Sequence, residues 1–287
     1  MKTRIKIRFI LMFMLMISIN NRNFASNIHV SRPSGTITVQ YFYDYLSPFG
    51  RWVEIPDEGY CWIPDVPAGF VPYNTNGHWV FTDEGTAWVS YYDWGWAPFH
   101  YGRWFYDDFY GWVWLPDTEW APAWVCWRHG GGYFGWYPLA PGWSININFA
   151  FINKIPDNRW MFCRENDLFH PRINKVILHS IDKIKIIHQT TVINHITTIH
   201  NVTYASGPER QEIRDTKFKE VPVYKIQKME KPGRHVIVNN NIKMYRPEIM
   251  KPRENEPAPM PQRIFKREEF HPAMSPVRSN EIRRTTK

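Results

Sequence analysis

Pairs of acidic residues lie among tryptophans, a setting in which glycoside hydrolases often place their catalytic carboxyl groups. Asp107 and Asp108 form one pair, and Asp117 and Glu119 form another. Glycoside hydrolysis needs two carboxyl groups roughly 5–10 Å apart across a cleft, and no pattern in the sequence predicts a cleft. Asp107 and Asp108 also fill a predicted turn, where aspartate is favoured because its side chain bonds its own backbone. We therefore predict that the protein is not an enzyme. A hydrolase is kept as a third possible function, after the two binding roles given at the end of this subsection.

The glycine-rich segment 130–135 fits the letters of the G-x-G-x-x-G dinucleotide motif. That motif requires a helix whose first N–H groups face the phosphates of the ligand. A Trp-Tyr-Pro sequence follows the glycines instead, among predicted strands. We interpret the segment as a hairpin loop and expect no cofactor.

Cysteine and histidine are not spaced for metal or redox chemistry. The three cysteines (Cys61, Cys126 and Cys163) lack C-x-x-C spacing, so we interpret them as small buried hydrophobic residues, with one disulfide and an unpaired third cysteine as the alternative. Five histidines fall within 31 residues: His170, His179, His188, His195 and His200. No two of them are spaced as metal ligands on one strand or on one turn of a helix. We therefore expect no metal site.

Aromatic side chains offer a different chemistry, because an exposed ring can stack on a sugar while its polar edge forms hydrogen bonds. Short segments rich in Trp, Gly and Pro alternate along the chain with the predicted hairpins. Their tryptophans would form such a platform if they were exposed, and they are Trp94, Trp96, Trp120, Trp124 and Trp136. The competing interpretation is that the tryptophans build the core of the fold.

A repeat of tryptophan and glycine favours the core interpretation. Glycine precedes a lead tryptophan by two residues in three copies, about 26 residues apart, and a second aromatic run follows each polar turn. A fixed period marks a repeated supersecondary unit, and Asp and Gly in the turns are typical of β-hairpins. The tryptophans predicted to have this structural role are Trp52, Trp62, Trp79, Trp88, Trp104 and Trp114.

These patterns predict an all-β fold of repeated Trp-rich β-hairpins that form a twisted sheet or small barrel. The hairpin domain covers residues 41–143, after a linker over 26–40. Residues 144–204 are predicted as a β-rich extension, although a helix stays an alternative for 176–204. Residues 205–287 are rich in proline and basic residues, and we predict a largely disordered basic tail with one strand near 235–238.

The net charge of +8 is divided unevenly along the chain. Residues 1–25 carry +5, residues 26–150 carry −8 and residues 151–287 carry +11. In the first segment, cations precede an apolar run and a polar stretch, the order of a signal peptide, and we predict cleavage after Ala25. The protein is therefore predicted to be exported, peripheral rather than transmembrane, and periplasmic, outer-membrane-associated or secreted. An acidic body on an exported chain argues against a nucleic-acid partner.

Two stretches resemble a known family. Residues 43–52 and 94–104 are similar to the bacterial YXWGXW-repeat domain family of unknown function, and residues 92–96 read Tyr-Asp-Trp-Gly-Trp, which matches the repeat. The resemblance covers residues 41–170. It implies an exported bacterial protein and brings no catalytic residues.

We predict an exported, non-enzymatic scaffold or interaction protein of the cell envelope. Its basic tail would bind envelope polymers or another envelope protein. The alternative is a glycan- or peptidoglycan-binding module that uses exposed tryptophan and tyrosine.

Overall fold

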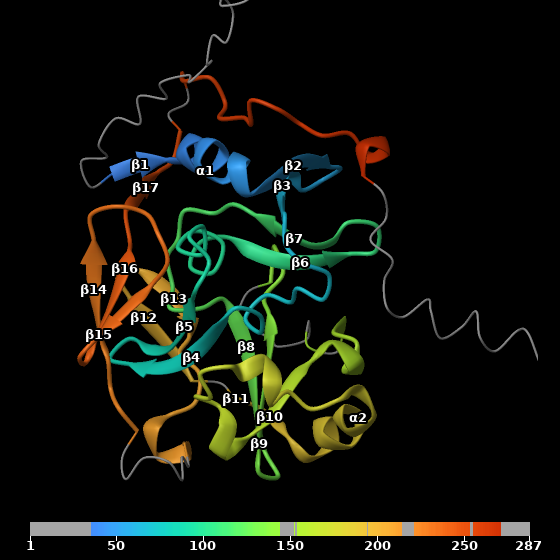
Figure 1. Cartoon of the computed structure of the whole chain (residues 1–287), viewed down its shortest axis with the longest axis vertical. Coiled ribbons are helices and arrows are strands. Elements are labelled where there is room, and N and C mark those ends of the chain that lie inside the picture. The colour runs from blue at the N-terminus through green and yellow to red at the C-terminus, as the bar shows by residue number, and fades with distance from the viewer. Residues whose placement is uncertain are drawn as a thin grey trace, which may run out of the picture. The chain divides into compact units, whose positions relative to one another are not determined.

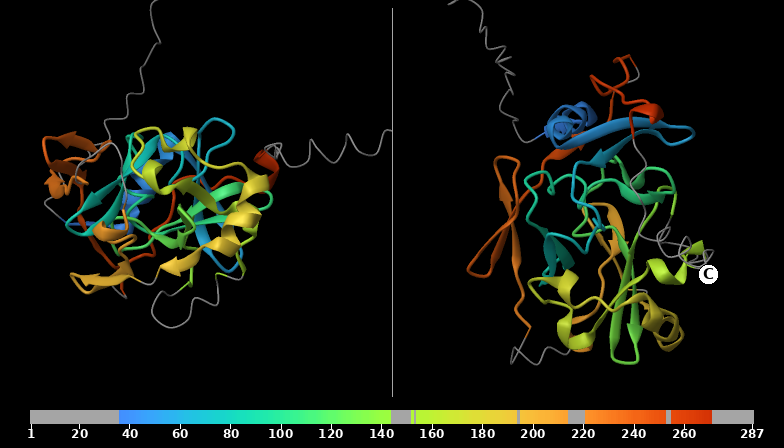
Figure 2. Two further views of the ribbon diagram at one scale, coloured as in Figure 1. Left: turned by 90° about the horizontal axis from the view of Figure 1, so that it is seen from below. Right: turned by 45° about the vertical axis from the view of Figure 1, so that its right-hand side comes forward.

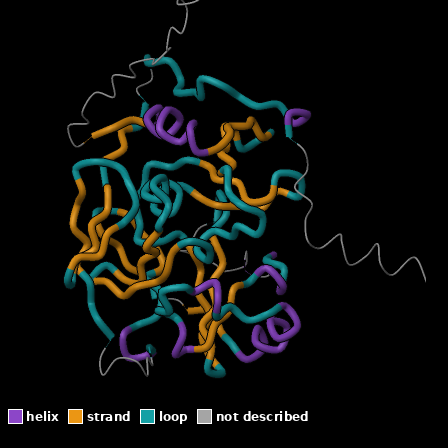
Figure 3. The backbone as a smooth tube through the Cα atoms, in the orientation of Figure 1, coloured by secondary structure: helices purple, strands orange, loops and turns teal. Residues whose placement is uncertain are grey.

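The computed structural model describes residues 36–143, 152, 154–193, 195–213, 221–252 and 255–270 (Figure 1). Most regular structure in these ranges is β-strand, which confirms the all-β prediction (Figure 3). The strands are divided among six small open sheets. The predicted signal peptide, most of the predicted linker, and the last 17 residues of the chain lie outside the described residues.

The predicted hairpins form, and their lead and second tryptophans are direct cross-strand partners. The pairs are Trp52 with Trp62, Trp79 with Trp88, and Trp104 with Trp114. The strands are β2 (Gly50–Ile55), β3 (Gly59–Pro64), β4 (Gly77–Thr82), β5 (Gly85–Ser90), β6 (Arg103–Asp107) and β7 (Gly111–Leu115). Since β3 also pairs with β7, the first and third hairpins join in the sheet β2-β3-β7-β6, while β4 and β5 pair alone.

A fourth hairpin repeats the same tryptophan pair. Strands β8 (Val125–Gly130) and β9 (Tyr133–Pro138) place Trp127 opposite Trp136. The predicted repeat does not include this copy, because Val125 stands where the other copies have glycine. The turn holds Gly130, Gly131 and Gly132 at positive φ, so the glycine-rich motif is a hairpin loop as predicted. Strands β10 (Met161–Arg164) and β11 (Thr191–Ile193) complete this sheet on either side.

The repeated glycine has a steric reason. In each of the first three hairpins, the indole of the second tryptophan lies against the glycine at the start of the hairpin. A Cβ on Gly77 would come within 2.5 Å of the Trp88 ring, and a Cβ on Gly50 within 2.7 Å of the Trp62 ring. Gly102 stands in the same relation to Trp114, at 2.8 Å. The spacing of glycine and tryptophan is therefore a packing requirement.

Tryptophan fills the core. Thirteen of the 15 tryptophans are buried, and the six with a predicted structural role are among them. Helix α1 (Val39–Leu46), which was not predicted, covers part of this cluster: Phe42 packs edge-on against Trp114, and the backbone oxygens of Tyr43 and Leu46 accept the indole N–H groups of Trp52 and Trp62.

The extension after residue 152 contains both a helix and strands. Helix α2 (Ser180–Gln189) occupies part of a segment for which strand was favoured, whereas β11, β12 (Ile196–Ile199) and β13 (Val202–Ala205) agree with the prediction. Arg128 of β8 explains where the helix ends, because its guanidinium donates to the backbone oxygens of Ile187 and Thr190 at 3.0 and 2.7 Å. Residues 144–151, the first part of the predicted β-rich extension, lie outside the described residues.

The prediction of a largely disordered tail does not hold for residues 221–250. Strands β14 (Lys225–Met229), β15 (Val236–Val238) and β16 (Asn241–Tyr245) form a sheet, and β15 is the predicted strand. Strand β17 (Glu248–Met250) pairs in parallel with β1 (Thr36–Thr38). These strands form because a few buried side chains, such as Ile242 and Met244, anchor an otherwise polar segment.

The last described segment covers the outer face of the sheet β2-β3-β7-β6. Phe265 and Phe270 pack on a small cluster around Val53, Cys61 and Val113, and the Phe265 N–H donates to the Trp52 carbonyl at 2.7 Å.

All three cysteines are buried and free. Short 3-10 helices complete the described structure: Ser47–Phe49, Asp157–Arg159, η4 (Glu165–Asp167), Ile173–Lys175, η6 (Arg210–Glu212) and Arg267–Glu269. None of the helices in the described ranges is both long enough and apolar enough to cross a membrane.

Two buried histidines join the C-terminal sheet to the tryptophan body. His235 accepts the Ser90 N–H at Nδ1, and His100 donates from Nδ1 to the Ala121 carbonyl. Their ring centroids are 4.8 Å apart. Burial lowers the pKa of His100 to about 4, and burial together with the neighbouring His100 holds the pKa of His235 well below its ordinary value.

Replacing Gly77 by alanine should destabilise the fold by about 1–3 kcal/mol, because the added methyl group overpacks the Trp88 ring. Urea unfolding followed by tryptophan fluorescence measures the change. Gly59→Asn is the matched control, since Gly59 has a φ of +86° and its Cβ position is open, and asparagine tolerates that conformation. Equal stability of Gly77→Ala and wild type would contradict the packing explanation.

The free energy of unfolding should fall as the pH drops from about 6.5 toward 4. Unfolded histidines take up a proton near their ordinary pKa of 6.5, whereas folded His100 stays neutral down to about 4. Stability from these groups is therefore complete above pH 6.5 and is lost below it, by at most about 1.4 kcal/mol per pH unit for each histidine. Urea titrations at several pH values should give a shallower slope for His235→Asn than for wild type. His188→Asn, at an exposed position of α2, should keep the wild-type slope.

Candidate functional site

The five tryptophans predicted as a sugar-binding platform are buried. The most exposed of them, Trp120, keeps only 6% of its surface accessible. The His100 ring stacks on Trp120 with 5.4 Å between the ring centroids, and the guanidinium carbon of Arg246 lies 3.6 Å from the Trp120 ring centroid. The others, with similar burial, are Trp94, Trp96, Trp124 and Trp136. The structure corrects the expectation of an exposed platform, and the reason is that these rings fill the space between hairpins.

A pocket of about 510 Å³ is lined in part by Arg103 of β6 and by Trp124. The guanidinium carbon of Arg103 lies 3.4 Å from the centroid of the Trp124 ring. Burial lowers the pKa of Arg103, and the nearby carboxylates of Asp117 and Glu119 oppose that shift. Trp124 donates its N–H to the His100 carbonyl at 3.0 Å, so the polar edge of the indole is satisfied inside the protein. A cation stacked on an aromatic ring therefore forms part of the pocket lining.

Polar groups from separate segments form the wall of the pocket. Asp117 and Glu119 come from the loop after β7, and Trp143 follows β9. Asn201 and Thr203 come from the hairpin of β12 and β13. His200 and Asn201 have φ values of +50° and +63°, the pattern of a tight hairpin turn, and asparagine accepts this conformation readily.

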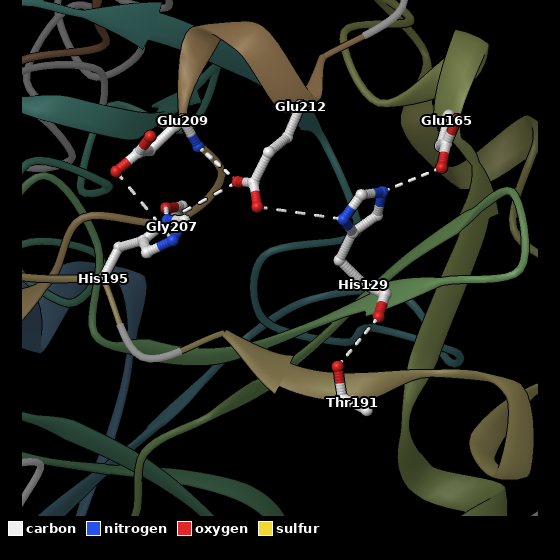
Figure 4. A network of polar contacts seen from close by, with 7 residues as sticks. All are labelled: His129, Glu165, Thr191, His195, Gly207, Glu209 and Glu212. Atoms are coloured by element: carbon white, nitrogen blue, oxygen red, sulfur yellow. Dashed lines mark hydrogen bonds and ion pairs between the residues drawn. The ribbon is translucent and has the colours of Figure 1, made fainter.

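A network of ionisable side chains holds the base of that hairpin (Figure 4). His129 of β8 contacts the Glu165 carboxylate at 2.8 Å and the Glu212 carboxylate at 4.0 Å. His195, just before β12, contacts Glu212 at 3.5 Å and Glu209 at 3.9 Å. The network therefore ties β8 to η4, η6 and the start of β12. It positions the strand pair that carries Asn201 to the pocket.

The histidines and carboxylates that were weighed for metal binding and hydrolysis lie partly in this region and partly elsewhere in the fold. His195 belongs to the network, and within the described ranges no three His, Cys, Asp or Glu side chains are grouped to hold a metal ion. Asp107 bonds the N–H groups of Phe109 and Tyr110 at 2.8 Å, which is the turn role expected for it. Asp108 contacts Arg159 at 3.6 Å.

Three of the residues that line the pocket were predicted as site candidates from the sequence. Asp117 and Glu119 were singled out as a carboxylate pair, and Trp124 was predicted as part of the aromatic platform. Asn201 and Thr203 lie more than 80 positions later in the chain, and they reach the pocket only through the fold. The one available signal was the His-Asn turn between two β-branched runs.

Comparison with known proteins gives one match. The model of a family described as Family of unknown function (DUF6600) matches residues 43–143, which are the hairpin region with its tryptophan pairs. No curated protein and no solved structure matches the chain. The match is consistent with an uncharacterised domain, and the resemblance to YXWGXW-repeat proteins stays a prediction.

Proposed function

We propose that this chain is an exported, non-enzymatic interaction protein of the cell envelope, and that it holds a saccharide in the pocket lined by Arg103 and Trp124. The observation that carries the proposal is the set of side chains around one pocket of about 510 Å³, which lies in the size range of small-molecule sites. The export part of the proposal rests on residues 1–25 alone.

The chemistry of the wall suits a sugar. Each sugar hydroxyl both donates and accepts hydrogen bonds, so it needs partners of both kinds. The carboxylates of Asp117 and Glu119 accept, Arg103 donates, and the Asn201 amide does both. Trp143, only partly buried beside them, offers an apolar ring face. This is the glycan-binding alternative with a different set of residues from the predicted platform.

The carboxylates support binding more than hydrolysis. Glycoside hydrolysis uses carboxyl groups on either side of the scissile bond. Asp117 and Glu119 are two residues apart in one loop, and Asp117 is engaged by the Thr118 N–H at 2.6 Å. A pair held in this way can orient a ligand from one side.

The basic C-terminal part supports an interaction role of a second kind. Residues 221–252 hold seven basic and two acidic residues. We expect a negatively charged envelope partner to bind there. The proposed binding role of the basic tail is thus the same as predicted, but folded strands would carry it.

Asn201→Gly should weaken saccharide binding by about five- to tenfold, because it removes one amide while glycine keeps the turn conformation. The measurement is calorimetry and tryptophan fluorescence with an N-acetylglucosamine trisaccharide and with soluble peptidoglycan fragments. Asn239→Gly is the matched control, since Asn239 also has a positive φ in a hairpin turn but lies outside the pocket.

Three results would contradict the proposal. One is the absence of heat and spectral change at saturating saccharide. Another is equal affinity of Asn201→Gly and wild type. The third is release of reducing ends by the wild-type protein, which would indicate a hydrolase.

A further inference from the structure

The C-terminal sheet has two chemically different faces. It lies on the side of the described body away from α2, with strand order β14-β16-β15 (Figures 1 and 2). The register places Ile226, Ile242 and Ile237 in one row, in which Ile242 is fully buried against the body and Ile237, at the sheet edge, is 36% exposed. Two neighbouring rows point the other way: Lys225, Asn241 and Val238 form one, and Gln227, Lys243 and Val236 form the other.

Exposed cations lie on this sheet and in the segment between β14 and β15. Lys225 and Lys243 are exposed on the outward face, Lys231 and Arg234 are exposed between the two strands, and Lys228 is exposed in the row of Met244 on the other side of the sheet. None of the five forms an ion pair with any residue that the structure describes. Arg246, which follows the same sheet, shows the contrast, because Glu84 neutralises it through two contacts of 2.8 and 2.9 Å. The charge on the face is therefore available to a partner.

Apolar side chains stand beside these lysines. Val236 and Val238 are 41% and 42% exposed, and they flank Lys243 and Asn241 at the edge of the sheet. Strand β15 pairs with β16 alone among the described strands, so this edge is open. Exposed β-branched residues on an open edge carry an aggregation risk that proteins usually avoid. Their presence beside uncompensated lysines calls for a partner that is both anionic and apolar.

We propose that this lysine–valine face (Lys225, Lys243, Val236 and Val238) docks on the surface of an anionic lipid bilayer. The lysines would meet the headgroup phosphates while the valines reach the boundary with the acyl chains. A peptide added to β15 is the weaker interpretation, because a three-residue strand offers few backbone hydrogen bonds. The inference rests on the proposed export to the envelope and is independent of the saccharide pocket.

Sedimentation with vesicles tests the proposal, using the chain that begins at Ser26, the form expected after export. Vesicles of phosphatidylglycerol and phosphatidylcholine should bind the protein, and binding should weaken at high salt. Vesicles of phosphatidylcholine alone should bind much less. Lys225→Gln with Lys243→Gln should lower the affinity by roughly 30-fold, from two lost charges near the surface.

Two matched variants separate the contributions of charge and apolar contact. Lys175→Gln with Lys185→Gln removes the same charge from exposed positions outside the face, and it should leave binding unchanged. Val236→Thr with Val238→Thr keeps β-branching and removes apolar surface, so the binding that survives high salt should be lost. Circular dichroism and urea unfolding of each variant show whether the fold is retained.

Equal losses in the two lysine pairs would overturn the proposal, as would equal binding to both kinds of vesicle. Absence of vesicle binding together with shifts of the β15 amides by an acidic extended peptide would assign the face to a peptide instead. Vesicle binding by Asn201→Gly at the wild-type level would show that failure of the saccharide proposal leaves this one standing.

Discussion

The contact between an indole ring and a glycine backbone is the constraint on which the rest of this structure depends. In three hairpins the ring of the second tryptophan lies against the first glycine, and its cross-strand partner is the lead tryptophan. Burying about 200 Å² of indole stabilises the fold by about 5 kcal/mol before entropy is counted. An indole N–H with no hydrogen-bond partner among the described residues, as in Trp79 and Trp88, costs about 1–3 kcal/mol, so the gain from burying the ring exceeds this cost.

Because most tryptophans are buried in the core, the side chains that can contact a ligand lie mainly in the loops and turns at the ends of the hairpins. In the pocket, Trp124 is stacked with Arg103, and the polar groups come from loops and from the turn at Asn201. The histidine and glutamate network at the base of that hairpin holds it in place. Trp143 and Trp112 are the two tryptophans that stay partly exposed, and one of them lines the pocket.

Local patterns predicted the hairpins because each one contains its own signal: glycine, a polar turn and paired tryptophans. The same signal is weaker in the fourth hairpin, where Val125 replaces the glycine. Long-range contacts explain what the sequence did not predict. Helix α2 depends on Arg128, some 60 positions earlier, to cap its last carbonyls. The C-terminal strands depend on partners such as Ser90 and Glu84, and composition alone indicates disorder there. Asn201 reaches the pocket for the same reason, through the fold.

The central claim is that the tryptophans form the core, and collisional quenching of their fluorescence by acrylamide tests it most directly. The native protein should emit at short wavelength and be quenched only slightly, with a large rise in quenching after urea unfolding. The small accessible fraction should fall when Trp143 is replaced by phenylalanine. Extensive quenching and long-wavelength emission from the native protein would show that most tryptophans are exposed, and would contradict the account.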